Sequence, residues 1–166
     1  MSTEGRNYLK DWLSQIKVSG RVLDVGGISC PMRNKVIDKG ITDYKILDIK
    51  EERKGVRTNY IVDLNNSFNN QIPYDLYYSA DFVFCTEVMQ FLYNPLMALQ
   101  NIYRLLADNG TLYITFHLTH PPMKGTDYLR YTRDGVIKLL NEANFEIEDI
   151  QEPMNGYYLI KAVCQH

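Results

Sequence analysis

The sequence predicts a single α/β domain built on a mostly parallel sheet, and three observations lead to this prediction. Its 166 residues are the length of one domain of ordinary size. Apolar residues make up 45% of the chain and charged residues 23%, so the chain can bury a core. Short β-branched or aromatic runs alternate along it with stretches of helical apolar spacing. This alternation indicates strands that are connected by helices.

The chain opens with a predicted helix, a strand and a glycine turn. The helix begins near Thr3 and is expected to stop at Gly20, because four apolar residues share one of its faces: Leu9, Trp12, Leu13 and Ile16. A β-branched run over 21–25 predicts the first strand, which ends in Gly26-Gly27. A short helical stretch is expected to follow as far as about Lys39.

Three more strands are predicted before the middle of the chain. The first two run over 44–49 and 59–64, and the roughly nine residues between them are fewer than a crossover helix with its loops usually needs. We therefore expect abbreviated helices on this side of the sheet. The segment 81–85 is apolar on both faces, which is typical of a central parallel strand covered by helices on each side.

The carboxyl-terminal half alternates helix and strand more regularly. A helical apolar stripe over 92–106 stops at Asp108-Asn109-Gly110, where Asn-Gly suits the positive φ of a turn, and a strand follows over 111–116. After a loop, Thr132 is expected to cap a helix whose apolar face is Val136, Leu139, Leu140 and Ala143.

The chain is expected to end in two strands, 145–150 and 157–163, joined by a turn over 152–156. A strand pair of this kind adds an antiparallel element to an otherwise parallel sheet. The complete series predicts a Rossmann-like three-layer sandwich on a mostly parallel seven-stranded sheet with abbreviated helices.

Acidic residues and a glycine turn follow the expected strands. Asp24 precedes Gly26-Gly27, Asp48 and Asp63 end the next two strands, and the fourth strand runs into Cys85-Thr86-Glu87. Asp48 lies 22 residues after Gly26, close to the offset at which an acid binds the ribose of a nucleoside. Taken singly, each acid could instead cap a helix or solvate a loop.

Two common nucleotide motifs are absent from the sequence. The residues after Gly26 do not complete GxGxxG, which disfavours a dinucleotide, and no GxxxxGK[ST] supports NTP hydrolysis. A ligand that carries a single nucleoside fits the pattern better.

Seven segments, in order, resemble the motifs of class I S-adenosylmethionine-dependent methyltransferases, with the type 11 subgroup the most similar. They are VLDVGG at 22–27, LDIK at 47–50, IVDL at 61–64, DFVFCTEVMQFLYNP at 81–95, RLLADNGTLYITF at 104–116, DYLRYT at 127–132 and LLNEANF at 139–145. The resemblance implies strand order 3-2-1-4-5-7-6 with the last strand antiparallel, and S-adenosyl-L-methionine as the cofactor.

The same resemblance assigns cofactor-binding residues. Gly26 and Gly27 would approach the methionine part, Asp48 would bind the ribose hydroxyls, and Asp63 the adenine amino group, with Asp24 bracing the turn. The remaining expected cofactor contacts are Ile49, Leu64 and Cys85.

Two residues depart from the family pattern. Ile28 stands where members commonly have a second glycine, and Phe91 replaces a usual histidine. Ile28 keeps two alternatives open: a non-catalytic module that retains the fold but has a degenerate cofactor loop, and a protein that binds another nucleoside ligand.

Methyl transfer from a sulfonium needs alignment and exclusion of water, and it needs a base only when the acceptor carries a proton. His117 and His120, just past the fifth strand, are the base candidates, although either could be a solvated loop residue or a structural hydrogen-bonder. Asp127, Tyr128 and Arg130 are expected to line the substrate side, where Arg130 could bind an acidic acceptor or pair with Asp127. No third ligand accompanies the two histidines, so no metal is expected.

The net charge and the cysteine content limit which partners and which compartment are expected. The net charge of -2 and pI near 5.9 supply no general positive field for nucleic acid. Three separated cysteines make no disulfide framework, and no apolar run approaches the length of a membrane span, so a cytoplasmic protein is expected. The expected acceptor is a small molecule or a saccharide. The sparse insertions suggest either that the acceptor is large or that a homodimer completes the pocket.

Overall fold

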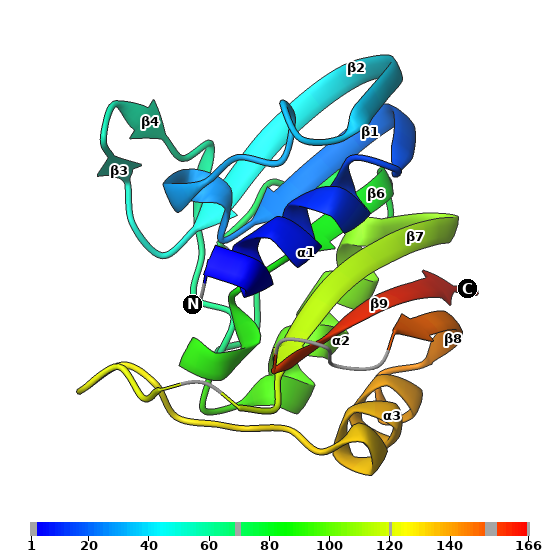
Figure 1. The fold of residues 1–166 in the computed structure, drawn as a ribbon. Coiled ribbons are helices and arrows are strands. Elements are labelled where there is room, and N and C mark those ends of the chain that lie inside the picture. The colour runs from blue at the N-terminus through cyan, green and yellow to red at the C-terminus, as the bar shows by residue number, and fades with distance from the viewer. Residues whose placement is uncertain (1–2, 69–70, 120, 152–155, 166) are drawn as a thin grey trace.

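The computed structural model describes residues 3–68, 71–119, 121–151 and 156–165. Its centre is a seven-stranded sheet in the order β5-β2-β1-β6-β7-β9-β8 (Figure 1). The strands are β1 (Lys17–Val25), β2 (Ile37–Asp48), β5 (Tyr60–Ile61), β6 (Ala80–Cys85), β7 (Leu106–His117), β8 (Phe145–Gln151) and β9 (Tyr157–Cys164). Only β9 runs antiparallel to its neighbours in this sheet, β7 and β8.

The strand order confirms the predicted fold class. The labels differ in detail because two short strands, β3 (Glu52–Arg53) and β4 (Val56–Arg57), form a separate two-stranded sheet. Counted within the large sheet alone, the order is 3-2-1-4-5-7-6. The seven-stranded sheet is therefore the one expected, with a hairpin added between its second and third strands.

Helices cover the two faces of the sheet unequally. Helix α1 (Thr3–Leu13) lies on one face, and α2 (Pro95–Leu105) and α3 (Arg133–Glu142) lie on the other (Figure 1). Alternate residues of each strand point to opposite faces. Val22 of β1 therefore packs in the cluster of α1, whereas Leu23 packs in the cluster of α2 and α3. The result is a three-layer sandwich with one thin layer.

The first predicted helix ends earlier than expected. Helix α1 stops at Leu13, and Gly20 lies inside β1 with φ +66°. The carboxylate of Asp81 occupies the space beside this glycine and accepts a hydrogen bond from the Arg21 N–H at 2.7 Å. Gly20 thus marks an irregularity in the pairing of β1 with β2, and its assignment as a helix stop was wrong.

The helical stretch expected up to Lys39 was also wrong. A three-residue 3₁₀ helix, η1 (Gly27–Ser29), follows the glycine turn, and β2 already begins at Ile37. Pro31 disfavours helical backbone at the residue before it, and Cys30 is extended with φ −165°. The strand expected over 59–64 is likewise shorter, because β5 comprises Tyr60–Ile61.

The carboxyl-terminal half agrees better with the sequence patterns. Helix α2 begins with Pro95 in its first turn, and Asn109 adopts the positive φ expected of it, 60°, although β7 already begins at Leu106. The hydroxyl of Thr132 accepts the Gly135 N–H at 3.2 Å and caps α3 as predicted. Strands β8 and β9 pair as expected, whereas residues 152–155 of the proposed turn lie outside the described residues.

None of the helices within the described ranges is both long and apolar enough to span a bilayer.

Candidate functional site

The candidate site lies at the edge of the sheet where the parallel strands end. Because β1, β2, β6 and β7 run in the same direction, their carboxyl ends meet at this edge. The edge collects the glycine turn after β1, Asp48 at the end of β2, Glu87 after β6 and His117 at the end of β7.

The glycine turn requires both of its glycines. Gly26 has φ +76°, and its N–H donates to the Leu47 carbonyl at 2.7 Å, which ties the end of β1 to β2. A Cβ at Gly26 would lie 2.2 Å from a methyl carbon of Val88, and one at Gly27 would lie 2.3 Å from the carboxyl carbon of Asp24. Close packing, together with the left-handed backbone of Gly26, therefore excludes larger residues.

Asp24 is a buried carboxylate beneath this turn, with 1% of its surface exposed. It accepts hydrogen bonds from the Met32 N–H at 2.8 Å and from the hydroxyl of Tyr44. Burial raises the pKa of Asp24 to about 6, although these two hydrogen bonds oppose the shift. Asp24 thereby links β1, the segment after η1, and β2 through polar contacts.

The end of β2 presents Asp48 and Ile49 to the edge. Asp48 is partly buried, and its Oδ1 accepts the Lys50 N–H at 3.1 Å. Ile49 is 61% exposed. The two residues place an acid beside an uncovered apolar surface.

Asp63 takes part in a local polar network. Its Oδ1 accepts from the backbone and side-chain N–H groups of Asn65, both at 3.0 Å, and its Oδ2 accepts from Asn66 Nδ2 at 2.7 Å. Leu64 and Cys85 are buried in the core, and burial raises the pKa of the Cys85 thiol. Only the backbone of these two residues can therefore face a ligand at the edge.

Ile28, the departure from the family pattern, is 2% exposed. It is absent from the non-glycine residues with positive φ, so the backbone at this position does not require glycine. Its side chain is buried in the protein and is not displayed at the surface.

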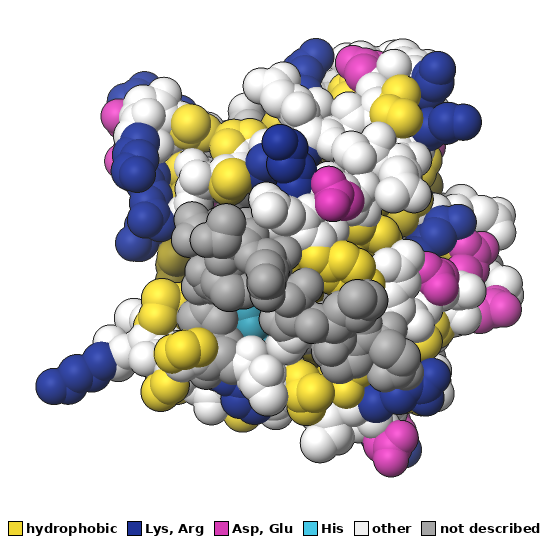
Figure 2. All heavy atoms as spheres, viewed as in Figure 1, with side chains coloured by type: hydrophobic (Ala, Val, Ile, Leu, Met, Phe, Trp, Pro, Cys, Tyr) yellow, Lys and Arg dark blue, Asp and Glu magenta, His cyan; other side chains and the backbone are white. Residues whose placement is uncertain are grey.

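The hairpin formed by β3 and β4 contacts η1, which follows the glycine turn. Arg53 of β3 donates from Nη1 to the hydroxyl of Ser29 in η1 at 2.6 Å. Figure 2 shows Lys and Arg side chains gathered over β3 and β4, and the exposed cations there are Lys50, Arg53, Lys54 and Arg57. The hairpin lies between β2 and β5, where the sequence leaves too few residues for a crossover helix.

His117 is buried, with 1% exposure, and pairs with Glu87. The His117 Nε2 and Glu87 Oε1 atoms are 3.3 Å apart, and the ring of Tyr157 lies 5.4 Å from the imidazole, centroid to centroid. The sequence marked His117 but not its pairing with Glu87, which depends on the neighbouring positions of β6 and β7. The second base candidate, His120, lies outside the described residues.

The proposed substrate-side residues are partly engaged with one another. Arg130 binds the carboxylate of Asp127 through two hydrogen bonds of 2.5 and 2.6 Å, and the Met123 N–H donates to the same carboxylate at 3.0 Å. Tyr128 is 55% exposed and forms an edge-to-face pair with Tyr93, which is 61% exposed. The loop thus places exposed Tyr128 against Tyr93, which precedes α2, and contains the Asp127–Arg130 ion pair.

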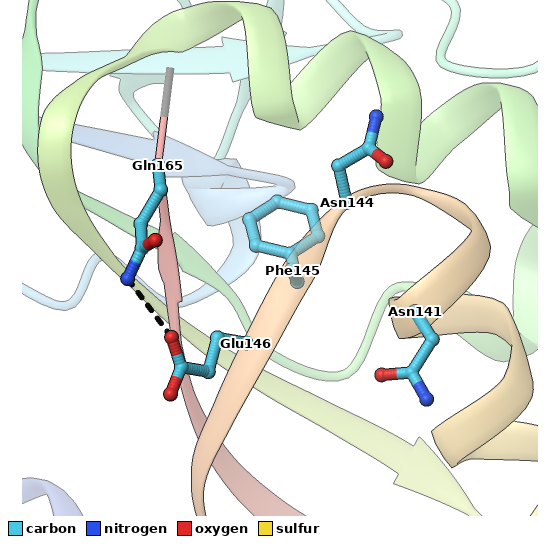
Figure 3. A pocket seen from close by; sticks show the side chains of 5 residues that line it. All are labelled: Asn141, Asn144, Phe145, Glu146 and Gln165. Atoms are coloured by element: carbon cyan, nitrogen blue, oxygen red, sulfur yellow. Dashed lines mark hydrogen bonds between the residues drawn. The ribbon is translucent and has the colours of Figure 1, made fainter.

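A separate hollow of about 450 Å³ lies at the opposite edge of the sheet (Figure 3). It is lined by Asn141, Asn144, Phe145, Glu146 and Gln165, and Gln165 Nε2 donates to Glu146 Oε2 at 2.9 Å. Phe145 begins β8 and Gln165 follows β9, so this hollow is remote from the glycine turn. Within the described ranges, no three His, Cys, Asp or Glu side chains form a potential metal site.

The sheet order and the glycine turn define a Rossmann-like domain of the class I methyltransferase type. The chain matches the methyltransferase domain family over residues 3–150 and belongs to that family. No curated protein matches it in sequence.

Solved structures of the same fold are distant in sequence. The 1,6-didemethyltoxoflavin-N1-methyltransferase of Burkholderia thailandensis, with bound S-adenosylhomocysteine, has a TM-score of 0.69 and 17% identity, with 99% of this chain and 78% of that chain covered. An S-adenosylmethionine-dependent methyltransferase from Mesorhizobium loti has a TM-score of 0.69 and 14% identity, covering 94% and 96%. The [4+2]-cyclase SpnF has a TM-score of 0.67 and 16% identity, covering 98% and 82%. These comparisons support S-adenosyl-L-methionine as the cofactor of this fold, as the sequence predicted.

Proposed function

We propose that this protein is an S-adenosylmethionine-dependent methyltransferase that acts on a small molecule or a saccharide. The observation that carries the proposal is the glycine turn braced by buried Asp24, with Asp48 one strand away, in a chain of the methyltransferase domain family. These groups stand where a nucleoside-bearing ligand would meet both the turn and an acid.

The residues of the edge suit the parts of such a cofactor. The backbone of the Gly26-Gly27 turn would approach the methionine part, and Asp48 would accept hydrogen bonds from the ribose hydroxyls. The exposed side chain of Ile49 offers an apolar surface to the adenine. Asp63, already bound by two asparagines, would receive the adenine amino group on its remaining lone pairs.

The cofactor supplies a methyl group that its positive sulfur already activates. The chain's task is to align the acceptor with that group and to exclude water. Tyr128 and Tyr93 support a ring-shaped acceptor, because exposed aromatic faces stack on sugars and flat heterocycles. The neighbour from Burkholderia thailandensis, which binds 1,6-didemethyltoxoflavin, is consistent with a small-molecule acceptor.

We also propose that the protein is cytoplasmic and forms a homodimer. Three free cysteines fit a reducing cytoplasm, and a second copy of the chain could complete the substrate side of the pocket. Light scattering would establish whether the protein is a dimer.

Thermal denaturation with S-adenosylhomocysteine tests cofactor binding directly. At 100 times its dissociation constant, the ligand should stabilise the protein by about 2.7 kcal/mol. Adenosine and ATP serve as controls, because equal stabilisation by them would indicate another nucleoside ligand. An absence of response to all three would indicate a non-catalytic module. A screen for labelled-methyl incorporation then identifies the acceptor.

A further inference from the structure

Glu87 holds an unusual backbone conformation at the candidate site. It follows β6 and has φ +63°, one of five positive-φ residues other than glycine in the described part of the chain. Two of the others are asparagines, which tolerate this conformation better than glutamate does. Strain of this kind persists where surrounding contacts enforce it, and it is often found at functional sites.

Besides the hydrogen bond that Gln90 Nε2 donates to its carbonyl at 3.0 Å, two contacts from the neighbouring strand hold Glu87 in place. Its N–H donates to the hydroxyl of Thr115 at 2.8 Å, and Thr115 is fully buried in β7. Its Oε1 is buried and lies 3.3 Å from Nε2 of His117. Both partners belong to the neighbouring strand, so the strand pairing determines where the carboxylate points.

Of the two residues in the pair, Glu87 is the one with an accessible side chain. Both ring nitrogens of His117 are buried, and 2% of its side chain is exposed, whereas 29% of the Glu87 side chain is exposed. Because Oε1 faces the histidine, the exposed surface belongs to the rest of the glutamate side chain. An acceptor at this edge can therefore reach Glu87 but not the imidazole that the sequence indicated.

Aromatic and polar groups of the described residues contact the pair. The ring of Tyr157 packs on His117, and Tyr8 of α1 lies beside Tyr157. Burial and the charge of Glu87 both raise the pKa of Tyr157, so this phenol stays neutral. The Tyr131 N–H donates to the His117 carbonyl at 2.8 Å and fixes the end of β7.

We propose, on the basis of the function above, that Glu87 is a catalytic residue that takes a proton from the acceptor, with His117 as its positioning residue. The acceptor's oxygen, nitrogen or carbon bonds to the methyl carbon, the carbon–sulfur bond breaks with its electron pair on sulfur, and the acceptor's proton passes to the Glu87 carboxylate. The substrate class is therefore one that must lose a proton: a hydroxyl, an N–H or an activated C–H.

The test uses two substitutions at one position. Glu87→Gln keeps the shape and removes the base. Glu87→Gly removes the side chain and suits the positive φ, and the space left can admit formate. Glu142→Gln, at the exposed end of α3, is the matched control. Labelled-methyl transfer is measured with catechol, xanthine, methyl α-glucoside and an acetoacetyl thioester, and with nicotinamide, whose ring nitrogen carries no proton.

Loss of a general base is expected to lower transfer to the proton-losing acceptors by about 100-fold or more in both Glu87 variants. Added sodium formate should restore the Glu87→Gly rate in proportion to its concentration, an effect that a purely structural role would not produce. S-adenosylhomocysteine affinity should stay within about twofold in all three variants.

A second readout does not depend on turnover. Relief of the positive φ should leave the melting temperature of Glu87→Gly equal to wild type or up to about 4 °C higher. A fall of more than about 5 °C would indicate a structural role and overturn the proposal. Transfer to nicotinamide alone, transfer to no panel member by a cofactor-binding wild type, or unchanged rates in Glu87→Gln would also overturn it. Failure of the wild type to bind S-adenosylhomocysteine would instead refute the proposed function on which it rests.

Discussion

The half of the sheet that carries the glycine turn and the half that carries the two larger helices are held together by different contacts. Around β1 and β2, buried Asp24, Tyr44 and backbone N–H groups hold short connections in place. Around β6, β7 and β9, fully buried apolar side chains of α2 and α3 fill the space above the sheet. The polar contacts hold the glycine turn at the candidate ligand site, and we expect the enclosed apolar contacts of α2 and α3 to contribute more to the stability.

The helices on the two faces of the sheet also differ in how completely their apolar side chains are buried. Several α1 residues retain some exposure, such as Leu9 at 8% and Trp12 at 9%, while Leu99 and Ile102 of α2 have none. A helix with a partly wet interface contributes less per residue than one that is fully enclosed.

The largest expected effect therefore comes from α2. Leu99→Ala should lower the free energy of unfolding by about 2–5 kcal/mol, because it leaves a cavity in an enclosed core. Leu9→Ala on α1 should cost clearly less, since the site is open at its rim. Urea denaturation of both variants measures this, and equal losses would show that the two faces contribute alike.

Buried Asp24 in the polar half should make the stability of the protein depend on pH. The pKa of Asp24 is about 6 in the folded protein against an ordinary value of 3.8, so between these pH values the folded state keeps a proton that the unfolded state loses. Stability should thus fall as pH rises from about 4 to 6, by on the order of 2–3 kcal/mol, and this contribution should then level off.

Asp24→Asn tests that slope. The variant cannot ionise but can still accept the Met32 N–H, so its stability should lose this dependence between pH 4 and 6. Denaturation at four pH values, with exposed Asp11→Asn as the control, provides the measurement. A slope that persists in Asp24→Asn would assign it to other groups.

Asp48 should affect ligand binding without affecting the fold. Asp48→Ala is expected to weaken S-adenosylhomocysteine binding at least tenfold, about 1.4 kcal/mol, because ribose hydroxyls lose a charged acceptor. Calorimetry is the measurement, and Asp38→Ala, at the opposite end of β2, is the control. Unchanged affinity in a folded Asp48→Ala protein would remove this residue from the site.

The smallest effect is expected at the start of α3. Thr132→Ala removes the hydroxyl that accepts the Gly135 N–H and should cost about 1 kcal/mol of stability. Cofactor affinity should not change, because this helix end belongs to the apolar half. A measurable loss of affinity would show that the two halves are coupled.

Sequence patterns predicted the elements of the apolar half better than those of the polar half. Helices α2 and α3 were recognisable because the apolar spacing of both and the Thr132 cap of α3 act locally. The connection from Gly27 to Ile37 was not, because Met32 is held there by side chains of the two flanking strands, Asp24 and Tyr44, and not by contacts within a helix. Gly20 was misassigned for a similar reason, since the partner that occupies its space, Asp81, is 61 residues away.

The sequence by itself determined the class of sheet, the order of its elements along the chain and the acids and glycines that follow its strands, because strand and helix periodicities and glycine turns are local properties. Only the tertiary structure decided which of those residues are accessible. It buried His117 and exposed part of Glu87 beside it, because the burial and pairing of these two residues depend on which strands become neighbours.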